Sequence, residues 1–460
     1  MRLIGDKKFY SRTMRIAIPI IIQNGITNLV GMLDNIMIGQ TGTEQMTGVA
    51  IVNQLVFVFN IFIFGIISGA GIFGAQYYGK GDHEGIRNTF RFKIISCFII
   101  MSAGIILFLQ SGSGLISIYL HEGGSAGDTA AALGYGLTYI KIMVIGMVPF
   151  TFSQIYSSTL RETGETVMPM TAGVCAVAIN TVLNYILIFG KFGAPALGVS
   201  GAAIATVISR FGECALIIIW THIKREKYQF ICGVYKTLKV PAELVKQIII
   251  KGSPLMVNEA LWSMGMAVMM QCYSIRGLDV VAAMNISTTV SNVFNVIFIA
   301  MGSAIAIIIG QLLGAGKMEQ ARDNAAKLIF FSVICSAAAG VIMLALSPLF
   351  PKIYNTTDDV RALAVKFIIV AAMFMPAYAF TNASYFTIRS GGKTIVTFLF
   401  DSVFVWTVSI PLAMCLTRLT VWNIVVIYFI CQSAEIIKCV IGFILVKKGV
   451  WLTNITVNSK

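Results

Sequence analysis

Long apolar runs, separated by short polar segments, dominate the chain. Most runs reach about 20 residues, the length of a helix that crosses the hydrocarbon core of a bilayer. Within lipid the backbone must satisfy its own hydrogen bonds, so such runs become helices. The runs cover residues 14–38, 50–76, 92–110, 134–158, 167–190, 197–221, 247–271, 283–312, 326–348, 362–387, 395–416 and 421–446. The pattern predicts an all-α integral membrane protein with twelve transmembrane helices.

A segment near the start of the chain recurs in the second half without a gap, so that every matched pair has the same spacing. The matched residues are Pro19, Gly42, Ile51, Asn60, Ser68, Gln76 and Gly79, followed by Pro254, Gly277, Ile286, Asn295, Ser303, Gln311 and Gly314. A second match, Arg-x-x-Gly-x-Thr, begins at Arg161 after the fourth run and at Arg389 after the tenth, where it suits a tight turn.

The repeat divides the chain into two halves of six helices each. Because six is even, both halves enter the membrane from the same side, and their pseudo-two-fold axis lies near the membrane normal. We therefore predict an N-terminal six-helix lobe over 1–221, a cytoplasmic linker over 222–246 and a C-terminal six-helix lobe over 247–460.

Charge is scarce and is unevenly placed. Only 12% of the residues are charged, against about 25% in a soluble protein. Lys and Arg collect in the N-terminal tail, the predicted loop 80–93, the linker and the last tail, whereas the predicted loops 39–49 and 111–129 contain neither. The positive-inside rule then predicts a multi-pass protein of the cytoplasmic membrane with both termini in the cytoplasm. The first run exceeds a signal-peptide core and predicts a retained helix.

Several function classes are not expected. The net charge of +14 forms no basic stripe with interleaved aromatic residues, so no nucleic-acid partner is predicted. Nine scattered cysteines and three histidines indicate neither a disulfide framework nor a zinc site, and no cofactor is expected. No H-E-x-x-H, G-x-S-x-G or paired-carboxylate motif is placed to support catalysis, so the sequence does not indicate an enzyme.

Polar residues within the N-terminal runs predict an ion site. Asp34 lies deep in the first run, and a carboxylate inside a membrane faces a cavity or a partner. Asn180 and Asn184 share one face of the fifth helix, and Thr206 lies in the sixth. Together these groups could hold Na⁺ or a protonated carboxyl. Two alternatives stay open: Asp34 caps a neighbouring helix, and the amides are ordinary contacts between helices.

The C-terminal runs carry fewer specific candidates. Glu259 is a second buried carboxylate with a predicted coupling or substrate role. Asp401 could serve likewise or could pair with Arg389 or Lys393. The acids of the sixth and twelfth helices, Glu213 and Glu435, favour intrahelical ion pairs with Arg210 and Lys438. Candidates for lining a substrate cavity are Asn53, Asn60, Asn292, Asn295, Met256 and Asp401. A methionine-rich wall would accommodate varied apolar cations, and lipid-facing methionine is the alternative.

These landmarks together resemble the multidrug and toxic compound extrusion (MATE) family. The motifs are Leu33-Asp34-Asn35-Ile36-Met37-Ile38-Gly39, the Gln-x-x-Gly pairs at Gln76 and Gln311, Leu160-Arg161-Glu162-Thr163-Gly164, Ile179-Asn180-Thr181-Val182-Leu183-Asn184, and the segment from Leu197 to Thr206. The resemblance implies a two-lobed antiporter of twelve helices in the lipid bilayer that exports small cationic or amphipathic substrates in exchange for H⁺ or Na⁺. We expect it to be a monomer.

The resemblance also assigns roles to single residues. It implies ion coupling by Asp34 with Asn180 and Thr206, and an acidic coupling position at Glu259. Asn184 departs from the pattern, because many members carry Asp there, and Tyr378 stands where one branch carries an acid. The coupling ion, H⁺ or Na⁺, is therefore left open, and a Na⁺ at Asp34 is the only metal expected. The rival functions are a lipid-linked oligosaccharide flippase of the same superfamily, a membrane-embedded enzyme and a passive channel.

Overall fold

The structure is a computed structural model that describes residues 3–120, 129–354 and 356–457, and this part of the chain is helical without strands. The α-helices are α1 (Lys7–Gly39), α2 (Thr43–Lys80), α3 (His83–Leu120), α4 (Thr129–Glu162), α5 (Val167–Phe189), α6 (Val199–Ile223), α7 (Ala242–Ser274), α8 (Leu278–Gly314), α9 (Met318–Leu346), α10 (Asp358–Ser390), α11 (Thr394–Phe398), α12 (Ile410–Leu419) and α13 (Ile424–Lys448). Short 3₁₀ turns η1 (Gln229–Ile231) and η2 (Phe350–Ile353) and π-helical segments η3 (Leu399–Val403) and η4 (Val405–Ser409) complete the elements.

The predicted all-α membrane fold is confirmed. In the described ranges, eleven helical segments are long and apolar enough to span a bilayer, with Thr394–Leu419 counted as one. The predicted seventh span is the long helix α7, which is not among those eleven. Its Asn258 and Glu259 lie in the middle of the helix.

The repeat extends to the ends of the helices. The first and last residues of α7 follow those of α1 by one repeat spacing, which is the distance in sequence from Pro19 to Pro254. The first residue of α9 follows that of α3 by the same spacing. Gly81 and Gly316, in the turns before α3 and α9, both adopt the left-handed conformation, with φ of 76° and 73°. The two ends of α13 likewise share one spacing from the two ends of α6. Residues related by these spacings are therefore structural equivalents.

The described chain forms two compact units. Unit 2 comprises Ile22–Gly74 and Asp82–Val245, and unit 1 comprises Met1–Ile21, Ala75–Gly81 and Lys246–Lys460. The start of α1 and the end of α2 thus belong with the C-terminal half of the sequence. The lobe boundaries predicted from the repeat stay a prediction.

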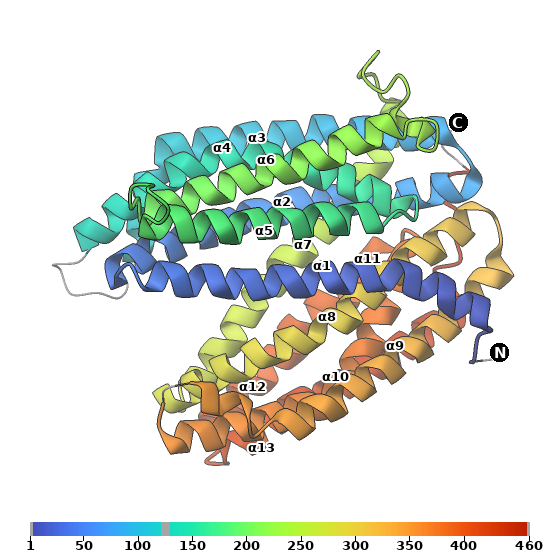
Figure 1. The fold of residues 1–460 in the computed structure, drawn as a ribbon. Coiled ribbons are helices and arrows are strands. Elements are labelled where there is room, and N and C mark those ends of the chain that lie inside the picture. Colours follow the sequence, from blue (N-terminus) through green and yellow to red (C-terminus); the bar gives the residue numbers. More distant parts are fainter. Residues whose placement is uncertain (1–2, 121–128, 355, 458–460) are drawn as a thin grey trace. The chain divides into compact units, whose positions relative to one another are not determined.

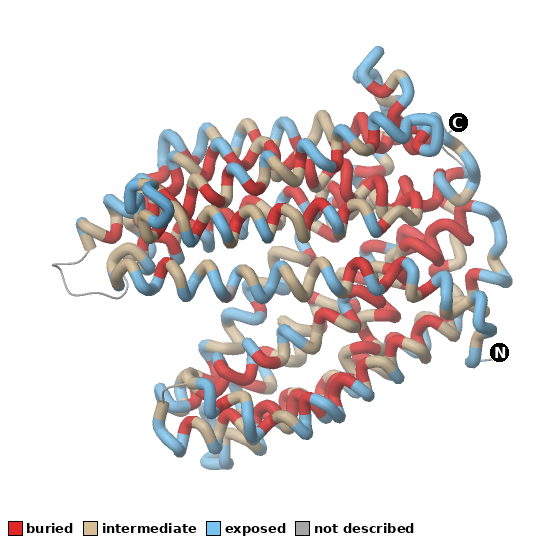
Figure 2. Tube along the Cα trace, in the orientation of Figure 1, coloured by how far each residue is buried: buried red, intermediate tan, exposed pale blue. Residues whose placement is uncertain are grey.

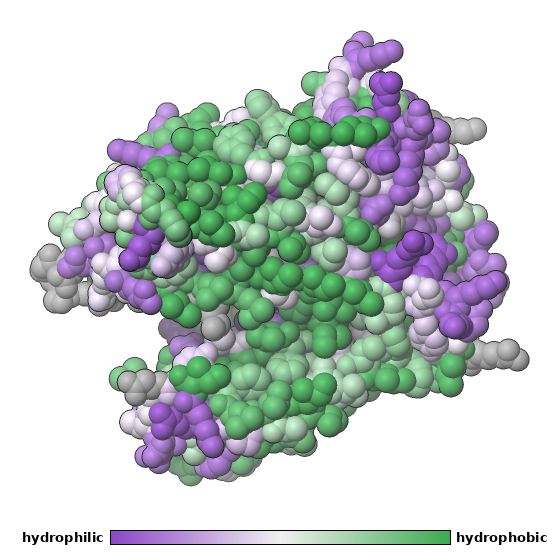
Figure 3. All heavy atoms as spheres, viewed as in Figure 1, coloured by the Kyte–Doolittle hydropathy of each residue, from purple (hydrophilic) through white to green (hydrophobic). Residues whose placement is uncertain are grey.

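In unit 2, neighbouring helices pack along their length. Contacts join α3 to α4, α4 to α6 and α5 to α6, and these helices lie side by side in Figure 1. Buried and exposed residues alternate along each of them, because one side meets its neighbours (Figure 2). Apolar side chains cover the visible sides of the helices, and hydrophilic ones gather near the helix ends (Figure 3). This distribution suits helices that stand in a bilayer.

In unit 1, α10 packs against α8, α9 and α13. The core at this junction is aliphatic, with Ile305, Leu328 and Ile388 all fully buried. The repeated Gln-x-x-Gly motif joins the end of α2 to α8. A Cβ on Gly79 would lie 1.9 Å from the Gln311 carbonyl oxygen, and one on Gly314 would lie 1.8 Å from that of Gln76. The two motifs therefore cross backbone to backbone, where only glycine fits.

The Gln76 side chain hydrogen-bonds residue 390 and residues 453–455, next to the place where α2 and α8 cross. Its Nε2 donates to the carbonyl oxygens of Ser390 (2.9 Å) and Thr453 (3.2 Å), and its Oε1 accepts from the Ile455 amide (2.9 Å). A buried amide with all of these groups paired is stabilising, and truncation would leave the backbone groups unsatisfied. The motif in the sequence thus marks a structural joint.

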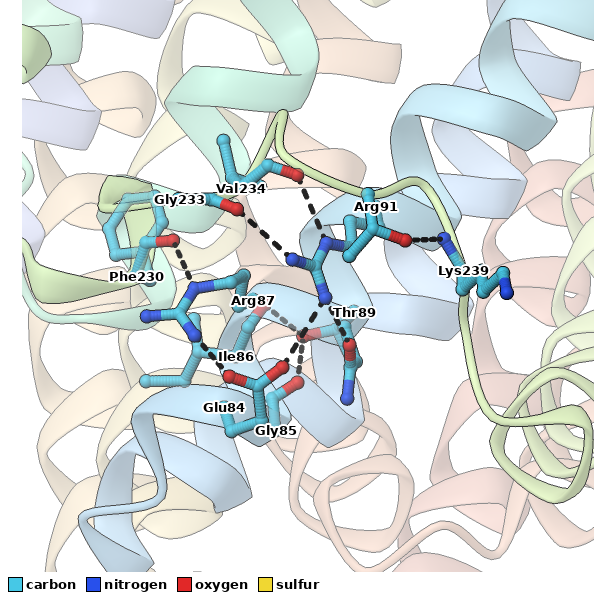
Figure 4. A network of polar contacts seen from close by, with 12 residues as sticks. Glu84, Gly85, Ile86, Arg87, Thr89, Arg91, Phe230, Gly233, Val234 and Lys239 are labelled. Atoms are coloured by element: carbon cyan, nitrogen blue, oxygen red, sulfur yellow. Dashed lines mark hydrogen bonds and ion pairs between the residues drawn. The ribbon is translucent and has the colours of Figure 1, made fainter.

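The linker predicted over 222–246 docks on unit 2. Arg91 donates to the carbonyl oxygens of Val234 (3.0 Å) and Gly233 (3.1 Å), and Arg87 donates to that of Phe230 (3.4 Å) (Figure 4). Glu84 pairs with both arginines. These arginines belong to α3, which begins at His83, so the loop predicted over 80–93 is wrong beyond residue 82. Charged side chains at a helix end snorkel or bind carbonyl groups and need not signal a loop.

The predicted loop over 111–129 is also shorter than expected. The helix α3 continues to Leu120, and 121–128 lie outside the described residues. Ser111, Ser113 and Ser117 are helical although the polar segment predicted a loop, and Ser117 donates to the Ser113 carbonyl oxygen. Hydroxyl groups that bond the preceding turn allow a polar stretch to remain helical.

Candidate functional site

The predicted ion-site residues of unit 2 come together in the structure. Asp34 lies in α1, Asn180 and Asn184 share one face of α5, and Thr206 lies in α6, which packs along α5. Asn180 and Asn184 are buried, whereas Asp34 is half-buried. The i, i+4 spacing on α5 places both amides at successive turns of the same face.

A chain of hydrogen bonds joins these four side chains. Asn184 Nδ2 donates to Asp34 Oδ1 (2.7 Å) and to Asn180 Oδ1 (3.1 Å). Asn180 Nδ2 donates to Thr206 Oγ1 (3.3 Å). When the Asn180 amide is flipped, so that its nitrogen and oxygen exchange places, the nitrogen instead donates to both Asp34 oxygens, at 3.1 and 3.2 Å, and the oxygen accepts from Thr206. Because an ionised carboxylate only accepts, the flipped amide matches the charged form of Asp34.

Asp34 is held by neutral groups. Among the described residues, no Lys or Arg forms an ion pair with it. In the same part of the chain, the buried Oδ1 of Asn184 has no hydrogen-bond partner. A carboxylate in apolar surroundings with no counter-charge favours binding a proton or a cation. The spare amide oxygen is a ligand type that Na⁺ takes, so both expected ions fit these residues.

The other unit 2 candidates lie apart from this group. Asn53 is exposed, and its Oδ1 accepts from the Tyr139 hydroxyl at 3.4 Å. Asn60 is half-buried, and within the described ranges its Oδ1 has no partner. Arg161, the predicted turn residue, donates to Gln23 Oε1 (2.7 Å) and so binds α4 to α1. The structure does not gather these residues into one site.

Asp401 of unit 1 has a different partner from the one expected. Lys438 Nζ, on α13, lies 2.6 Å from Asp401 Oδ1, and Asn258 Nδ2, on α7, donates to Asp401 Oδ2 at 3.1 Å. The expected pairing of Asp401 with Arg389 or Lys393 is therefore wrong. The expected pair of Glu435 and Lys438 is long, at 4.0 Å, because the ammonium is drawn to the nearer carboxylate.

The remaining unit 1 candidates are not joined by side-chain contacts. Glu259 is half-buried on α7, within electrostatic reach of Arg389 and Asp401. Arg389 stacks its guanidinium over the Phe386 ring at 5.3 Å. Asn295 and Met256 are half-buried, and Asn292 is exposed.

A buried ion pair in unit 2 was missed by the sequence reasoning. Lys93 of α3 is fully buried, and its Nζ lies 2.6 Å from Glu162 Oε1, 3.0 Å from Thr159 Oγ1 and 3.1 Å from Ser158 Oγ. The position of Lys93 among apolar residues, between Phe92 and Ile94, is the signal that could have found it.

Two glycines of α2 make room for this pair. A Cβ on Gly74 would lie 2.0 Å from Glu162 Oε2, and one on Gly71 would lie 2.8 Å from Glu162 Oε1. The carboxylate therefore lies directly against the α2 backbone. The pair thus joins α3 to α4 where both helices lie against α2.

Comparison with known proteins identifies the family of this chain. A sequence profile described as MatE matches residues 19–186 and 254–415. The chain is 24% identical to "Probable multidrug resistance protein NorM" of Thermotoga maritima, over 88% of this chain and 85% of that protein. It is 23% identical to "Multidrug resistance protein MdtK" of Yersinia pseudotuberculosis, over 86% and 85% of the two chains.

Solved structures share the fold. A crystal structure of MATE in the straight conformation has a TM-score of 0.87 at 18% identity and covers 98% of each chain. A MOP superfamily transporter from Pyrococcus furiosus, for which a binding pocket of reversed polarity is described, also scores 0.87 at 18% identity, over 98% of this chain and 97% of that one. Since the family profile covers most of the sequence in two repeated blocks, this chain belongs to the MATE (MatE) family of membrane transporters.

Proposed function

We propose that the protein is a secondary active antiporter that exports organic cations, including drugs, across the cytoplasmic membrane in exchange for H⁺ or Na⁺. In this proposal both termini lie in the cytoplasm. The observation that carries it is the Asp34 carboxylate, which contacts amides of α5 and has no basic partner among the described residues. The names of the relatives, which are multidrug resistance proteins, support the substrate class.

The amide of Asn180 suits both protonation states of Asp34. In one orientation its nitrogen donates to the carboxylate, and in the other its oxygen lies 3.1–3.2 Å from the Asp34 oxygens, where it accepts from a protonated carboxyl. For Na⁺, the oxygens of Asp34, Asn184 and Thr206 are the ligands that this group offers. The site can therefore alternate between loaded and empty states without a large rearrangement of its side chains.

The transport cycle follows from competition between positive charges. In the outward-open state the ion neutralises Asp34, which weakens the attraction for a cationic substrate and releases it. In the inward-open state the ion leaves and a new substrate binds. Each elementary charge moved down 100 mV contributes about 2.3 kcal/mol. That free energy sustains a roughly fiftyfold substrate gradient, since about 1.4 kcal/mol corresponds to a factor of ten.

Transport in proteoliposomes tests this function. We expect an imposed H⁺ or Na⁺ gradient to drive ethidium movement, and Asp34→Asn to abolish it while the protein still folds. Asp358→Asn is the matched control, because the Asp358 side chain is 95% exposed at the start of α10. Normal ethidium transport by Asp34→Asn would refute the role of Asp34. Inactivity under both gradients, combined with binding of a lipid pyrophosphate, would instead favour a flippase.

A further inference from the structure

Lys438 and Asp401 form a largely buried ion pair inside unit 1. The Lys438 ammonium lies 2.6 Å from Asp401 Oδ1 and 5.4 Å from the centroid of the Phe400 ring, and both charged side chains are at least four-fifths buried. Asp401 Oδ2 accepts from Asn258 at 3.1 Å. Each carboxylate oxygen therefore has a donor of its own.

The backbone around Asp401 departs from regular α-helical geometry. Asp401 lies in the π-helical segment η3, where the wider turn shifts side chains relative to a regular helix. Ser402 Oγ donates to Asn258 Oδ1 (2.8 Å) and to the Asn258 carbonyl oxygen (2.9 Å), which fixes η3 against α7. Trp406 Nε1 donates to the Leu261 carbonyl oxygen (2.9 Å), one turn further along. The equivalent helix of unit 2, α5, is regular throughout.

The repeat shows that unit 2 has no such pair. Lys438 corresponds to Glu213 by the spacing that relates α13 to α6. Asp401 falls at the position of Gly173 by the spacing that relates Arg389 to Arg161. Gly173 lies against Gln23, the equivalent of Asn258, with a Cβ position 3.0 Å from Gln23 Nε2. At these two positions unit 1 carries an aspartate and a lysine, whereas unit 2 carries a glycine and a glutamate.

Several other titratable groups surround the pair. Those that interact electrostatically with it are Glu259 on α7, Tyr385 on α10, and Glu435 and Cys439 on α13. Arg389 is the basic neighbour of Glu259. Glu435 is 4.0 Å from Lys438 and accepts from Thr381 Oγ1 at 2.5 Å. Lys438 therefore has Asp401 as its near partner and Glu435 as a more distant one.

We propose that Lys438 is a resident cation of unit 1, which occupies the place at Asp401 that a mobile cation would otherwise take. Asp34 and Asp401 are both acids that accept a hydrogen bond from an asparagine, and they differ in having or lacking a lysine. A buried carboxylate with a tethered ammonium is already neutralised, and removing one partner of such a pair exposes an uncompensated charge. Lys438 thereby excludes Asp401 from ion coupling, which leaves the coupling ion to Asp34. The inference rests on the proposed ion-coupled function.

The test is the ion dependence of thermal stability in purified variants. In the Asp34→Asn background, the melting temperature should be the same in NaCl and in choline chloride at equal ionic strength. It should also be the same at pH 6 and at pH 8. Adding Lys438→Met should create a rise in melting temperature with Na⁺ or with falling pH, because ligands that bind the folded state stabilise it. Adding Asp401→Asn as a third change should remove that rise.

Two matched controls separate charge from packing. In the same Asp34→Asn background, Lys438→Arg keeps the positive charge and should leave the melting temperature insensitive to the ion. Lys327→Met breaks a lysine–aspartate pair of 2.5 Å on α9, with Asp323, and should not create ion dependence. An ion-insensitive Asp34→Asn/Lys438→Met protein would overturn the proposal.

A second variant keeps the proposal testable if Lys438→Met does not fold. Asp401→Asn alone should lower the melting temperature but preserve the wild-type difference between NaCl and choline chloride and between the two pH values. Loss of that difference would place the mobile ion at Asp401 and overturn the proposal. The readout is stability, so it can succeed or fail independently of the ethidium transport that tests Asp34.

Discussion

The contact between the second, third and fourth helices of each repeat is built in two chemically different ways. In unit 2, Lys93 and Glu162 form a buried ion pair against Gly74. In unit 1 the equivalent residues are Leu328, Ser390 and Ile309, of which Leu328 and Ile309 are fully buried. The aliphatic side chain of Ile309 thus stands where the Glu162 carboxylate lies in unit 2.

The helices of the two units share one register, but the interior residues at these three positions differ together. A carboxylate needs a base within reach and a glycine beneath it, whereas leucine and isoleucine fill the same space without either. Ser390 retains one polar link, from its Oγ to the Ala306 carbonyl oxygen at 3.5 Å. Changing only one of Lys93, Glu162 and Gly74 should therefore lower the free energy of unfolding strongly.

The largest effect is expected from Lys93→Met. This change leaves Glu162 buried without its base, and we expect the free energy of unfolding to fall by about 3–5 kcal/mol. Leu328→Met, at the equivalent place in unit 1, should cost less than about 1.5 kcal/mol. Denaturant unfolding in detergent micelles measures both.

A double variant sharpens the same point. Lys93→Met with Glu162→Met removes the pair completely and should recover most of the loss, because an apolar pair of similar volume can replace a buried ion pair. Equal losses of unfolding free energy in Lys93→Met and Leu328→Met, or no recovery in the double variant, would refute the claim that the two units are stabilised differently at this contact.

An intermediate effect is expected from Gly74→Ala. Its methyl group would meet the paired carboxylate of Glu162 at 2.0 Å, and we expect overpacking to cost about 1–3 kcal/mol in the free energy of unfolding. Gly25→Ala in α1 is the control, since a Cβ there meets nothing within 4 Å. A Gly74→Ala protein as stable as Gly25→Ala would show that Glu162 can move aside.

The smallest effect concerns the turns after α4 and α10, which carry opposite charges. Glu165 accepts from the Tyr228 hydroxyl (2.7 Å) and from Lys227 (3.0 Å), whereas its equivalent is Lys393. Burial raises the pKa of Glu165, but the hydrogen bonds from Tyr228 and Lys227 lower it more, so the pKa lies below its ordinary value.

The sign of the pH effect follows from that depressed pKa. The stabilisation is present above the ordinary value of 4.5 and is lost as pH falls through the folded-state pKa. Because Lys227 is exposed, we expect less than about 1 kcal/mol. The hydrogen-exchange protection factors of residues 224–231, taken relative to the intrinsic exchange rate at each pH, should fall at low pH in wild type. In Glu165→Gln they should already be low and should not fall further. Equal pH sensitivity in both proteins would contradict the assignment.

Much of the fold could be predicted from the sequence because lipid imposes one simple rule on every span. Apolar runs predict the helices, and the i, i+4 spacing predicts that Asn180 and Asn184 share one face of α5, which the hydrogen bond between the two amides confirms. The partner of Asp401 could not be found in this way, because Lys438 comes from a separate helix and the π-helical turns around Asp401 have no local signature. Lys93 was misplaced because a lysine near a helix end resembles a loop residue until its carboxylate partner is known.

The grouping of residues 1–21 and 75–81 with unit 1 has a consequence for biosynthesis. These segments leave the ribosome before α8, α10 or the last residues exist, and domains generally fold as units during synthesis. Gln76 can meet Ser390 only after α10 is made, and it can meet Thr453 and Ile455 only after residues 453–455 have been made. Unit 2 can thus fold while unit 1 is still being made, whereas unit 1 is completed only when Gln76 meets residues made more than 300 positions later.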